Sequence, residues 1–241
     1  MPAISVLIPC YNSERTVAAT LESVTTQTFP DWEIICVDDG SEDRSALVVE
    51  QCMREQPERQ IALVRSAHAG CAAATRIAIQ NAMSPICTIL DSDDTLLPHA
   101  LETIIQAFAA RPDVGFLWTR YLAVKEIPGA KPRGGRSKPL PAGKTLKEAL
   151  LAGWWGALAQ RAFRLAVYEK TPGLDPSLPY VVDQQLAALF AELGCAVMHV
   201  PVNTYVHLQH AAQMSARRYK EQQACRARVL ERLGGKYVSE R

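Results

Sequence analysis

Three carboxylates stand within four residues in the run Asp91-Ser92-Asp93-Asp94, directly after the apolar run Ile86–Leu90. Carboxylates this close repel one another unless a cation lies between them. Their oxygens are the ligands that Mg²⁺ prefers, and a metal held in this way can also bind phosphate oxygens. The spacing therefore predicts a divalent metal site that carries a phosphorylated ligand. A solvated turn followed by a helix cap would use the same residues.

A second acidic cluster, Asp38-Asp39-Gly40-Ser41, follows the apolar run Glu33–Val37. A carboxylate at this place can accept a hydrogen bond from the N3–H of uracil. Gly40 permits a tight backbone and Ser41 can cap the next helix. The alternative is again a turn with a cap and no ligand.

The first polar cluster of the chain is Pro9-Cys10-Tyr11-Asn12-Ser13-Glu14, which follows the apolar run Ile4–Ile8. The ring of Tyr11 offers a face on which a base can stack, although a tyrosine at this place can equally be a packing residue. Asn12 or Ser13 can cap the helix that the pattern predicts next.

The elements that position these clusters alternate between strand and helix patterns. Apolar runs predict strands, and amphipathic or alanine-rich stretches between them predict helices. This order predicts an α/β fold in which a mostly parallel sheet is flanked by helices. The polar clusters then meet at the carboxyl edge of the sheet, where such folds bind ligands. The predicted strands are Ile4–Ile8, Glu33–Val37, Ile61–Val64, Ile86–Leu90 and Val114–Val124.

The second half of the chain is less regular. Residues 125–147 contain four Pro, four Gly and seven Lys or Arg, which predicts a flexible basic loop that is either a linker or a cover over a phosphate-bearing substrate. Trp154-Trp155-Gly156 offers either an aromatic acceptor platform or an interior packing pair. The patterns predict helices over Leu146–Leu151, Phe163–Lys170 and Asp183–Leu193, and strands around 157–160, over Cys195–Val200 and over Tyr205–Leu208.

Three segments together resemble the hallmark segments of family 2 glycosyltransferases, which are inverting enzymes of the GT-A fold. They are Ile4–Asn12, Val37–Ser41 and Leu90–Asp94. The resemblance is strongest over residues 3–110 and can be traced to about residue 216. It implies a Rossmann-like nucleotide-sugar-binding half over 1–115, a smaller mixed half over 116–216 for the acceptor and catalysis, and a basic C-terminal helix over 217–241.

The resemblance implies that the first half holds the donor. Tyr11 and Asp39 would contact the base, and Arg76 would lie near the diphosphate although the family's usual Ala-Arg-Asn reads Thr75-Arg76-Ile77 here. Asp91 would contact the ribose or the metal, and Asp93 would be the direct ligand of Mn²⁺ or Mg²⁺. The implied nucleotide-binding residues are Pro9, Tyr11, Asn12, Glu14, Asp38, Asp39, Arg76, Asp91 and Ser92.

The resemblance also implies a catalytic base and a third metal ligand. Val182-Asp183-Gln184-Gln185-Leu186 stands where the family has Glu-Asp-x-Asp-Leu, so Asp183 keeps the central carboxylate and would deprotonate the acceptor hydroxyl. A simple N-cap is the alternative. The segment from His210 to Ser215, with Gln213 in place of the family's first serine, resembles a late His-x-x-Ser-x-Ser motif. His210 would then bind the metal or diphosphate, with His207 as its competitor.

Composition limits the partners and the compartment. The net charge of +1 gives no electrostatic case for nucleic acid. Seven cysteines without a CxxC pair favour a reducing, cytoplasmic location. No signal peptide is expected, and no apolar run approaches the roughly 18 residues of a membrane span. Eight Lys or Arg against three Glu in residues 217–241 suit either a solvated helix or a peripheral contact at the inner face of a membrane.

These observations predict a metal-dependent, inverting glycosyltransferase. We expect it to move a sugar from a nucleotide sugar, with UDP as the nucleotide, to a sugar or glycolipid acceptor in cell-surface polysaccharide or glycolipid synthesis. One alternative is a sugar nucleotidyltransferase, although Pro9–Glu14 lacks the glycines that cradle a triphosphate. The other is a non-catalytic nucleotide-sugar-binding protein, since the acidic neighbours of Asp183 are replaced.

Overall fold

The computed structural model describes residues 1–127, 129–135, 137–156, 160–210 and 218–234. Residues 157–159 of one predicted strand, Gln213 and Ser215 of the late motif, and the end of the basic segment at 235–241 lie outside the described residues.

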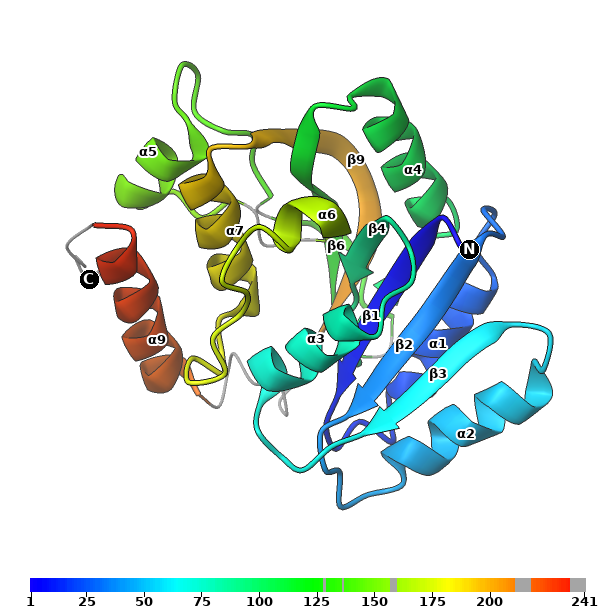
Figure 1. Cartoon of the computed structure of the whole chain (residues 1–241). Coiled ribbons are helices and arrows are strands. Elements are labelled where there is room, and N and C mark those ends of the chain that lie inside the picture. The colour runs from blue at the N-terminus through cyan, green and yellow to red at the C-terminus, as the bar shows by residue number, and fades with distance from the viewer. Residues whose placement is uncertain (128, 136, 157–159, 211–217, 235–241) are drawn as a thin grey trace.

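One mixed sheet forms the centre of the molecule (Figure 1). Its strand order is β3-β2-β1-β4-β8-β6-β9-β5, and β7 pairs with β6. The pairs from β3 to β4 are parallel, as the alternating pattern predicts. The strands are β1 (Ile4–Cys10), β2 (Trp32–Asp38), β3 (Gln60–Arg65), β4 (Ile86–Ile89), β5 (Thr95–Leu96), β6 (Val114–Lys125), β7 (Arg133–Gly134), β8 (Arg161–Arg164) and β9 (Ala196–Gln209).

Helices cover both faces of this sheet (Figure 1), which confirms the predicted α/β fold. Successive side chains of a strand point to opposite faces. Val6 of β1 accordingly packs in one apolar core with α1 and α4, and Leu7 packs in the other with α3, α7 and α9. The helices are α1 (Val17–Thr25), α2 (Ser45–Glu55), α3 (Cys71–Gln80), α4 (Ala100–Ala110), α5 (Leu146–Leu151), α6 (Leu165–Tyr168), α7 (Val182–Leu193) and α9 (Tyr219–Arg232).

Strand direction decides which residues reach the edge of the sheet at which β1, β2 and β4 end. β1, β2 and β4 run parallel, so the loops after Cys10, Asp38 and Ile89 emerge together. β8 runs antiparallel to both β4 and β6, and β9 runs parallel to β6. The carboxyl end of β9 and the amino end of β8 therefore reach this same edge. In β8, Arg161 pairs with Ile89, which is the last residue of β4.

The prediction of a helix over Phe163–Lys170 is wrong for its first two residues. Phe163 and Arg164 belong to strand β8, and the helix α6 is limited to Leu165–Tyr168. Phe163 pairs with Cys87 of β4 on one side and Phe116 of β6 on the other. Ladder bonds to two strands that are distant in sequence override the local helical pattern, which carries no information about them.

The basic segments at 125–147 and at the C-terminus are both tied to the body of the molecule. Ser137 is buried, and its hydroxyl donates to the Thr119 carbonyl at 2.5 Å. In α9, Cys225, Val229 and Leu230 pack into the core that α7 shares. The apolar face of this helix is therefore occupied by protein. Its arginines also contact protein groups: Arg226 lies over Trp155, Arg228 donates to Ser177 and Arg232 pairs with Asp175.

Candidate functional site

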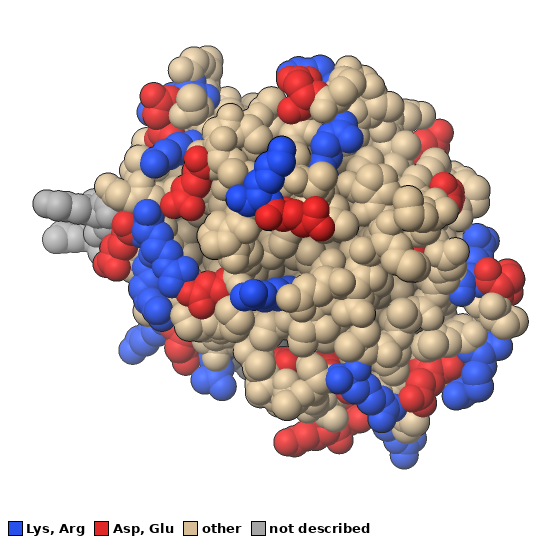
Figure 2. Space-filling model, viewed as in Figure 1, with Lys and Arg blue, Asp and Glu red and all other residues tan. Residues whose placement is uncertain are grey.

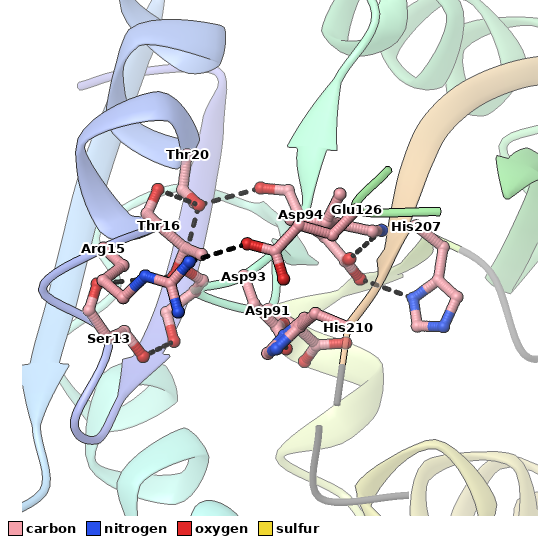
Figure 3. A network of polar contacts seen from close by, with 12 residues as sticks. Ser13, Arg15, Thr16, Thr20, Asp91, Asp93, Asp94, Glu126, His207 and His210 are labelled. Carbon is pink, nitrogen blue, oxygen red and sulfur yellow. Dashed lines mark hydrogen bonds and ion pairs between the residues drawn. The ribbon is translucent and has the colours of Figure 1, made fainter. Parts of the chain in front are cut away.

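The acidic loop 91–94 is fixed against the start of α1 (Figure 3). The hydroxyl oxygens of Ser13 and Ser92 are 2.8 Å apart. Thr16 donates to the Ser92 carbonyl at 2.9 Å, and Thr20 donates to the same carbonyl and to that of Asp94. Sequence reasoning missed both threonines, because a hydroxyl on a predicted helix gives no sign of what it contacts.

The carboxylate of Asp94 belongs to the protein framework. It is 1% exposed, and it accepts hydrogen bonds from the Leu208 amide at 2.8 Å and the Tyr205 hydroxyl at 2.7 Å. The ring Nδ1 of His207 lies 3.1 Å away, and this hydrogen bond raises the pKa of His207. Asp94 thus holds the acidic loop against β9, and both of its carboxylate oxygens already accept hydrogen bonds from that strand.

Asp93 of the acidic loop and His210, which follows β9, lie next to each other (Figure 3). The His210 Nε2 lies 3.0 Å from the Asp93 carboxylate. Burial raises the pKa of Asp93 to about 6, the charges of Asp94 and Asp91 add to this, and His210 opposes it. An excess of negative charge beside an imidazole suits a divalent cation. The structure thus separates the two histidine candidates, since His207 contacts Asp94 and His210 contacts Asp93.

The described residues contain no preassembled group of three or more His, Cys, Asp or Glu side chains that could hold a metal ion. Two protein ligands are nevertheless enough for Mg²⁺, which keeps several waters and usually binds through one or two carboxylates together with substrate phosphates. Asp93 and His210, which contact each other, can serve as two such ligands, because they offer a carboxylate oxygen and one imidazole nitrogen.

Asp91 lies beside a buried arginine that sequence reasoning missed. An Arg161 Nη2 atom is 3.5 Å from the Asp91 Oδ2, and the Tyr205 hydroxyl donates to the same oxygen at 3.2 Å. Arg161 is only 6% exposed. Burial disfavours its charged form, yet Asp91 and Asp183 hold the pKa of Arg161 above its usual range. Arg161 falls between two predicted elements, so no sequence pattern indicates what it contacts.

Asp183 lies close enough to Arg161 and Asp91 for its charge to interact with both. It stands in the first turn of α7, and its side chain is half-buried. Burial raises its pKa, the charge of Arg161 opposes this rise, and Asp91 adds to it. A carboxylate with a raised pKa is a stronger base than an exposed one and can accept a proton from a hydroxyl. Arg161 therefore lies in the electrostatic field of both Asp91 and Asp183.

Gln185 explains one departure from the family's acidic pattern. Its side-chain oxygen accepts from the Asp175 amide at 2.7 Å, and its nitrogen donates to the carbonyls of Leu178 at 2.8 Å and Asp175 at 3.3 Å. The side chain is buried and holds the loop before α7. An amide can both donate and accept, so it makes this pattern where a carboxylate could only accept.

Tyr11 and His68 form an aromatic pair near the end of β1. Their ring centroids are 4.0 Å apart and their planes differ by 21°. Both side chains are exposed on their outer sides, so they offer a surface to a planar ligand. Asp39 supports this pair from below, because its carboxylate is 2.9 Å from the His68 ring and accepts from the amides of Ala69 and Gly70.

The remaining residues of the first two clusters contact one another. The Asn12 side chain accepts from the Glu42 amide at 2.9 Å, and the Glu14 carboxylate accepts from the Arg44 amide at 3.0 Å. Asp38 accepts from the Ser41 amide at 3.3 Å. Pro9 lies within β1 and pairs with Val37 of β2. These contacts hold the two loops together beside the Tyr11 ring.

Arg76 lies apart from the acidic loop. Its Nη1 donates to the Leu174 carbonyl at 3.3 Å, and it lines a pocket of about 470 Å³ between α3, α7 and α9. None of Asp91, Asp93 and Asp183 lines this pocket. On this face of the molecule basic and acidic side chains are interspersed, as Figure 2 shows. The place of Arg76 near the diphosphate therefore stays a prediction.

The two tryptophans of the second half pack against protein groups. The Trp154 ring lies 5.5 Å from that of Trp118 in an edge-to-face arrangement. The Arg226 guanidinium lies over the Trp155 ring at 4.8 Å from its centroid. Both side chains remain half-buried, so packing accounts for most of their surface.

Known structures share this fold over almost the whole chain. S. aureus TarS in complex with UDP-GlcNAc matches with a TM-score of 0.72 at 18% identity, covering 99% of this chain and 68% of the other. The mannosyltransferase PcManGT from Pyrobaculum calidifontis, in complex with GDP-Man and Mn²⁺, matches with a TM-score of 0.69 at 17% identity, covering 99% and 66%. These similarities confirm the predicted GT-A fold.

Two relatives illustrate the sequence similarity. Chondroitin synthase from Escherichia coli is 24% identical over 97% of this chain and 33% of its own length. The enzyme named UDP-Glc:alpha-D-GlcNAc-diphosphoundecaprenol beta-1,3-glucosyltransferase, also from Escherichia coli, is 31% identical over 49% of this chain and 45% of its own length. The chain thus spans less than half the length of these curated relatives.

The sequence profile described as Glycosyl transferase family 2 matches residues 5–165, which include the acidic loop, the Tyr11 loop and Arg161. The match covers well over half of the chain, and the fold and the order of the polar clusters agree with it. The chain therefore belongs to glycosyltransferase family 2.

Proposed function

We propose that this chain transfers a sugar from a UDP-sugar to an acceptor hydroxyl with inversion at the anomeric carbon. The observation that carries the proposal is the proximity of the Asp91 and Asp183 carboxylates to Arg161, with Asp93 two residues further along the same acidic loop. The names of two similar proteins support a UDP-linked donor, since TarS forms a complex with UDP-GlcNAc and the Escherichia coli enzyme is named for UDP-Glc.

The nucleotide would lie over the first half, residues 1–115. Tyr11 and His68 present exposed ring surface for a base to stack on. Asp39 fixes His68 and the backbone of Ala69 and Gly70, so it acts as the anchor of the base pocket. Asn12, Glu14, Asp38 and Pro9 shape the loops around it, and Ser92 holds the acidic loop against Ser13.

A divalent cation, Mn²⁺ or Mg²⁺, would be held by Asp93, Asp91 and His210. The raised pKa of Asp93 and its contact with His210 support this assignment. When bound, such an ion neutralises the charge that develops on the leaving diphosphate. The complex of PcManGT with GDP-Man and Mn²⁺ gives a further reason to test manganese first.

Asp183 would act as the general base from the second half, residues 116–216. Inversion requires the acceptor to attack opposite the leaving group, and Asp183 comes from a different element than the acidic loop, while its charge and that of Asp91 both act on Arg161. An ionised Asp183 takes the proton of the acceptor hydroxyl as the new bond forms. The carboxylate then carries this proton until solvent removes it.

The acceptor is proposed to be a sugar or a glycolipid of polysaccharide synthesis, in keeping with the names of the two relatives. Among the described residues, no helix is long and apolar enough to cross a lipid bilayer. Because the apolar face of α9 is buried, a membrane contact of this helix would be electrostatic and peripheral. A cytoplasmic protein at the inner face of a membrane is consistent with this arrangement.

A thermal-shift panel of nucleotide sugars, with and without Mn²⁺, tests the proposed donor. A ligand at 100 times its dissociation constant stabilises the folded state by about 2.7 kcal/mol. For a domain of this size we expect a rise in Tm of roughly 5 °C or more with UDP-sugars and Mn²⁺. Adenine and cytosine nucleotides serve as controls. If no nucleotide sugar shifts the Tm with Mn²⁺ present, the proposed function is wrong.

A further inference from the structure

Arg161 is a buried guanidinium that the protein itself satisfies poorly. An arginine carries five N–H donors in a planar fork. Within the described residues, Arg161 makes one side-chain hydrogen bond, the 3.5 Å contact with Asp91, and its Nε is buried with no partner. Burial of a charged donor without acceptors costs free energy. A buried guanidinium fork that is largely unmatched therefore points to acceptors that a ligand supplies.

Another arginine of the same strand shows what a purely structural guanidinium looks like here. The Arg164 Nε donates to the Val114 carbonyl and its Nη2 donates to the Phe108 carbonyl, both at 2.9 Å. Its guanidinium also lies 4.9 Å from the centroid of the Phe108 ring. Two nitrogens of Arg164 thus each donate to a backbone carbonyl, and its guanidinium plane packs on an aromatic ring. Within the described part of the chain, the Arg161 guanidinium has neither kind of partner.

The position of Arg161 indicates which part of a ligand it meets. Its charge couples to Asp91 on the metal side and to Asp183 on the base side. In an inverting transfer, the leaving group and the base lie on opposite sides of the anomeric carbon. A side chain between the two lies beside the sugar ring that is transferred. This step rests on the function proposed above.

We propose that Arg161 is a specificity-determining residue that donates hydrogen bonds to oxygen atoms of the transferred sugar. The planar fork matches two adjacent oxygen acceptors, which can be neighbouring ring hydroxyls or the carboxylate of a uronic acid. The Asp91 carboxylate lies 3.5 Å from the guanidinium and helps to hold it in place, and the charges of Asp91 and Asp183 raise the pKa of Arg161. The nucleotide and its diphosphate are bound by other residues, so Arg161 acts on donor choice.

The test compares the affinities for UDP and for UDP-sugars in two variants, Arg161→Lys and Arg161→Gln, by isothermal titration at one fixed Mn²⁺ concentration. The probes are UDP, UDP-glucose, UDP-N-acetylglucosamine and UDP-glucuronate. A change that acts through Asp91 alters the affinity for UDP and the affinity for the UDP-sugar by the same factor. It therefore cancels in the ratio of the two affinities. For the preferred sugar, we expect Arg161→Gln to weaken UDP-sugar binding roughly 10- to 100-fold relative to UDP. Arg161→Lys should show a smaller loss, because an ammonium is a point donor.

Arg164→Lys is the matched control, since it should lower the Tm without changing this ratio. The UDP-sugar whose affinity falls most relative to UDP identifies the oxygens that Arg161 contacts. A largest loss for UDP-glucuronate would indicate a carboxylate, and a largest loss for a neutral sugar would indicate hydroxyls. The proposal is overturned if the variants bind UDP and UDP-sugars with the same affinity ratio as the wild-type protein. If Arg161→Gln does not fold, Arg161→Lys alone decides between these results. A wild-type protein that binds no UDP would overturn the proposed function itself.

Discussion

Replacing Asp183 with asparagine should lower sugar transfer by roughly 100-fold or more while leaving UDP-sugar affinity within about threefold of wild type. Asparagine keeps the size of the side chain and its hydrogen-bonding capacity, but it cannot accept the proton of the acceptor hydroxyl. Asp183 lies in the field of Arg161, whose only side-chain hydrogen bond among the described residues goes to Asp91, so the nucleotide side is expected to stay intact. The measurement is UDP release, together with titration of the donor.

Asp175→Asn is a matched control for this experiment. Asp175 lies on the loop before α7, and its carboxylate pairs with Arg232 of α9 instead of facing Arg161. It should retain wild-type turnover. The pH profile gives a second readout. Burial raises the pKa of Asp183, and only the ionised form is a base, so activity should fall as the pH drops through that raised value. Full activity in Asp183→Asn would remove this residue from the mechanism.

Replacing Asp93 with alanine should abolish the part of UDP-sugar binding that depends on metal. Asp93 is the carboxylate of the acidic loop whose pKa is raised to about 6, whereas Asp94 is bound by Tyr205 and Leu208. We expect the Mn²⁺-dependent rise in Tm to vanish and the affinity for UDP-sugar to fall at least tenfold, with little change in the Tm of the protein alone. Thermal shift and titration with and without EDTA measure both effects.

Asp113→Ala is the control for Asp93→Ala, since Asp113 is an exposed aspartate paired with Arg111. It should keep the response to Mn²⁺. EDTA treatment of the wild-type protein should reproduce the Asp93→Ala result without any change in sequence. Tight UDP-sugar binding that neither the substitution nor EDTA affects would contradict the assignment of the metal site.

Much of the fold could be predicted from the sequence because its first half is locally consistent. Apolar runs, helix patterns and turn residues alternate in one order, and this order fixes a parallel sheet and its ligand-binding edge. The same pattern could not distinguish Asp93 from Asp94, although the two are neighbours. Only the approach of β9 does so, because it brings Leu208, Tyr205 and His207 to Asp94 and His210 to Asp93.

The second half shows where sequence reasoning fails. The sequence patterns predict two strands here, over Cys195–Val200 and over Tyr205–Leu208. The structure has one strand whose register against β6 shifts between Thr119 and Arg120, and such an irregularity accommodates a proline. Arg161 was missed for a related reason: β8 has only four residues, and its position depends on its pairing with β4 and β6.

The most direct measurement of the central claim is UDP release by the wild-type chain from UDP-sugars, with Mn²⁺ or EDTA, and with water or simple saccharides as acceptor. The stereochemistry of the new product is followed by NMR. We predict UDP release that requires Mn²⁺, and a first product of inverted anomeric configuration. No UDP release from any UDP-sugar with Mn²⁺, or a first product with retained configuration, would contradict the proposed transfer.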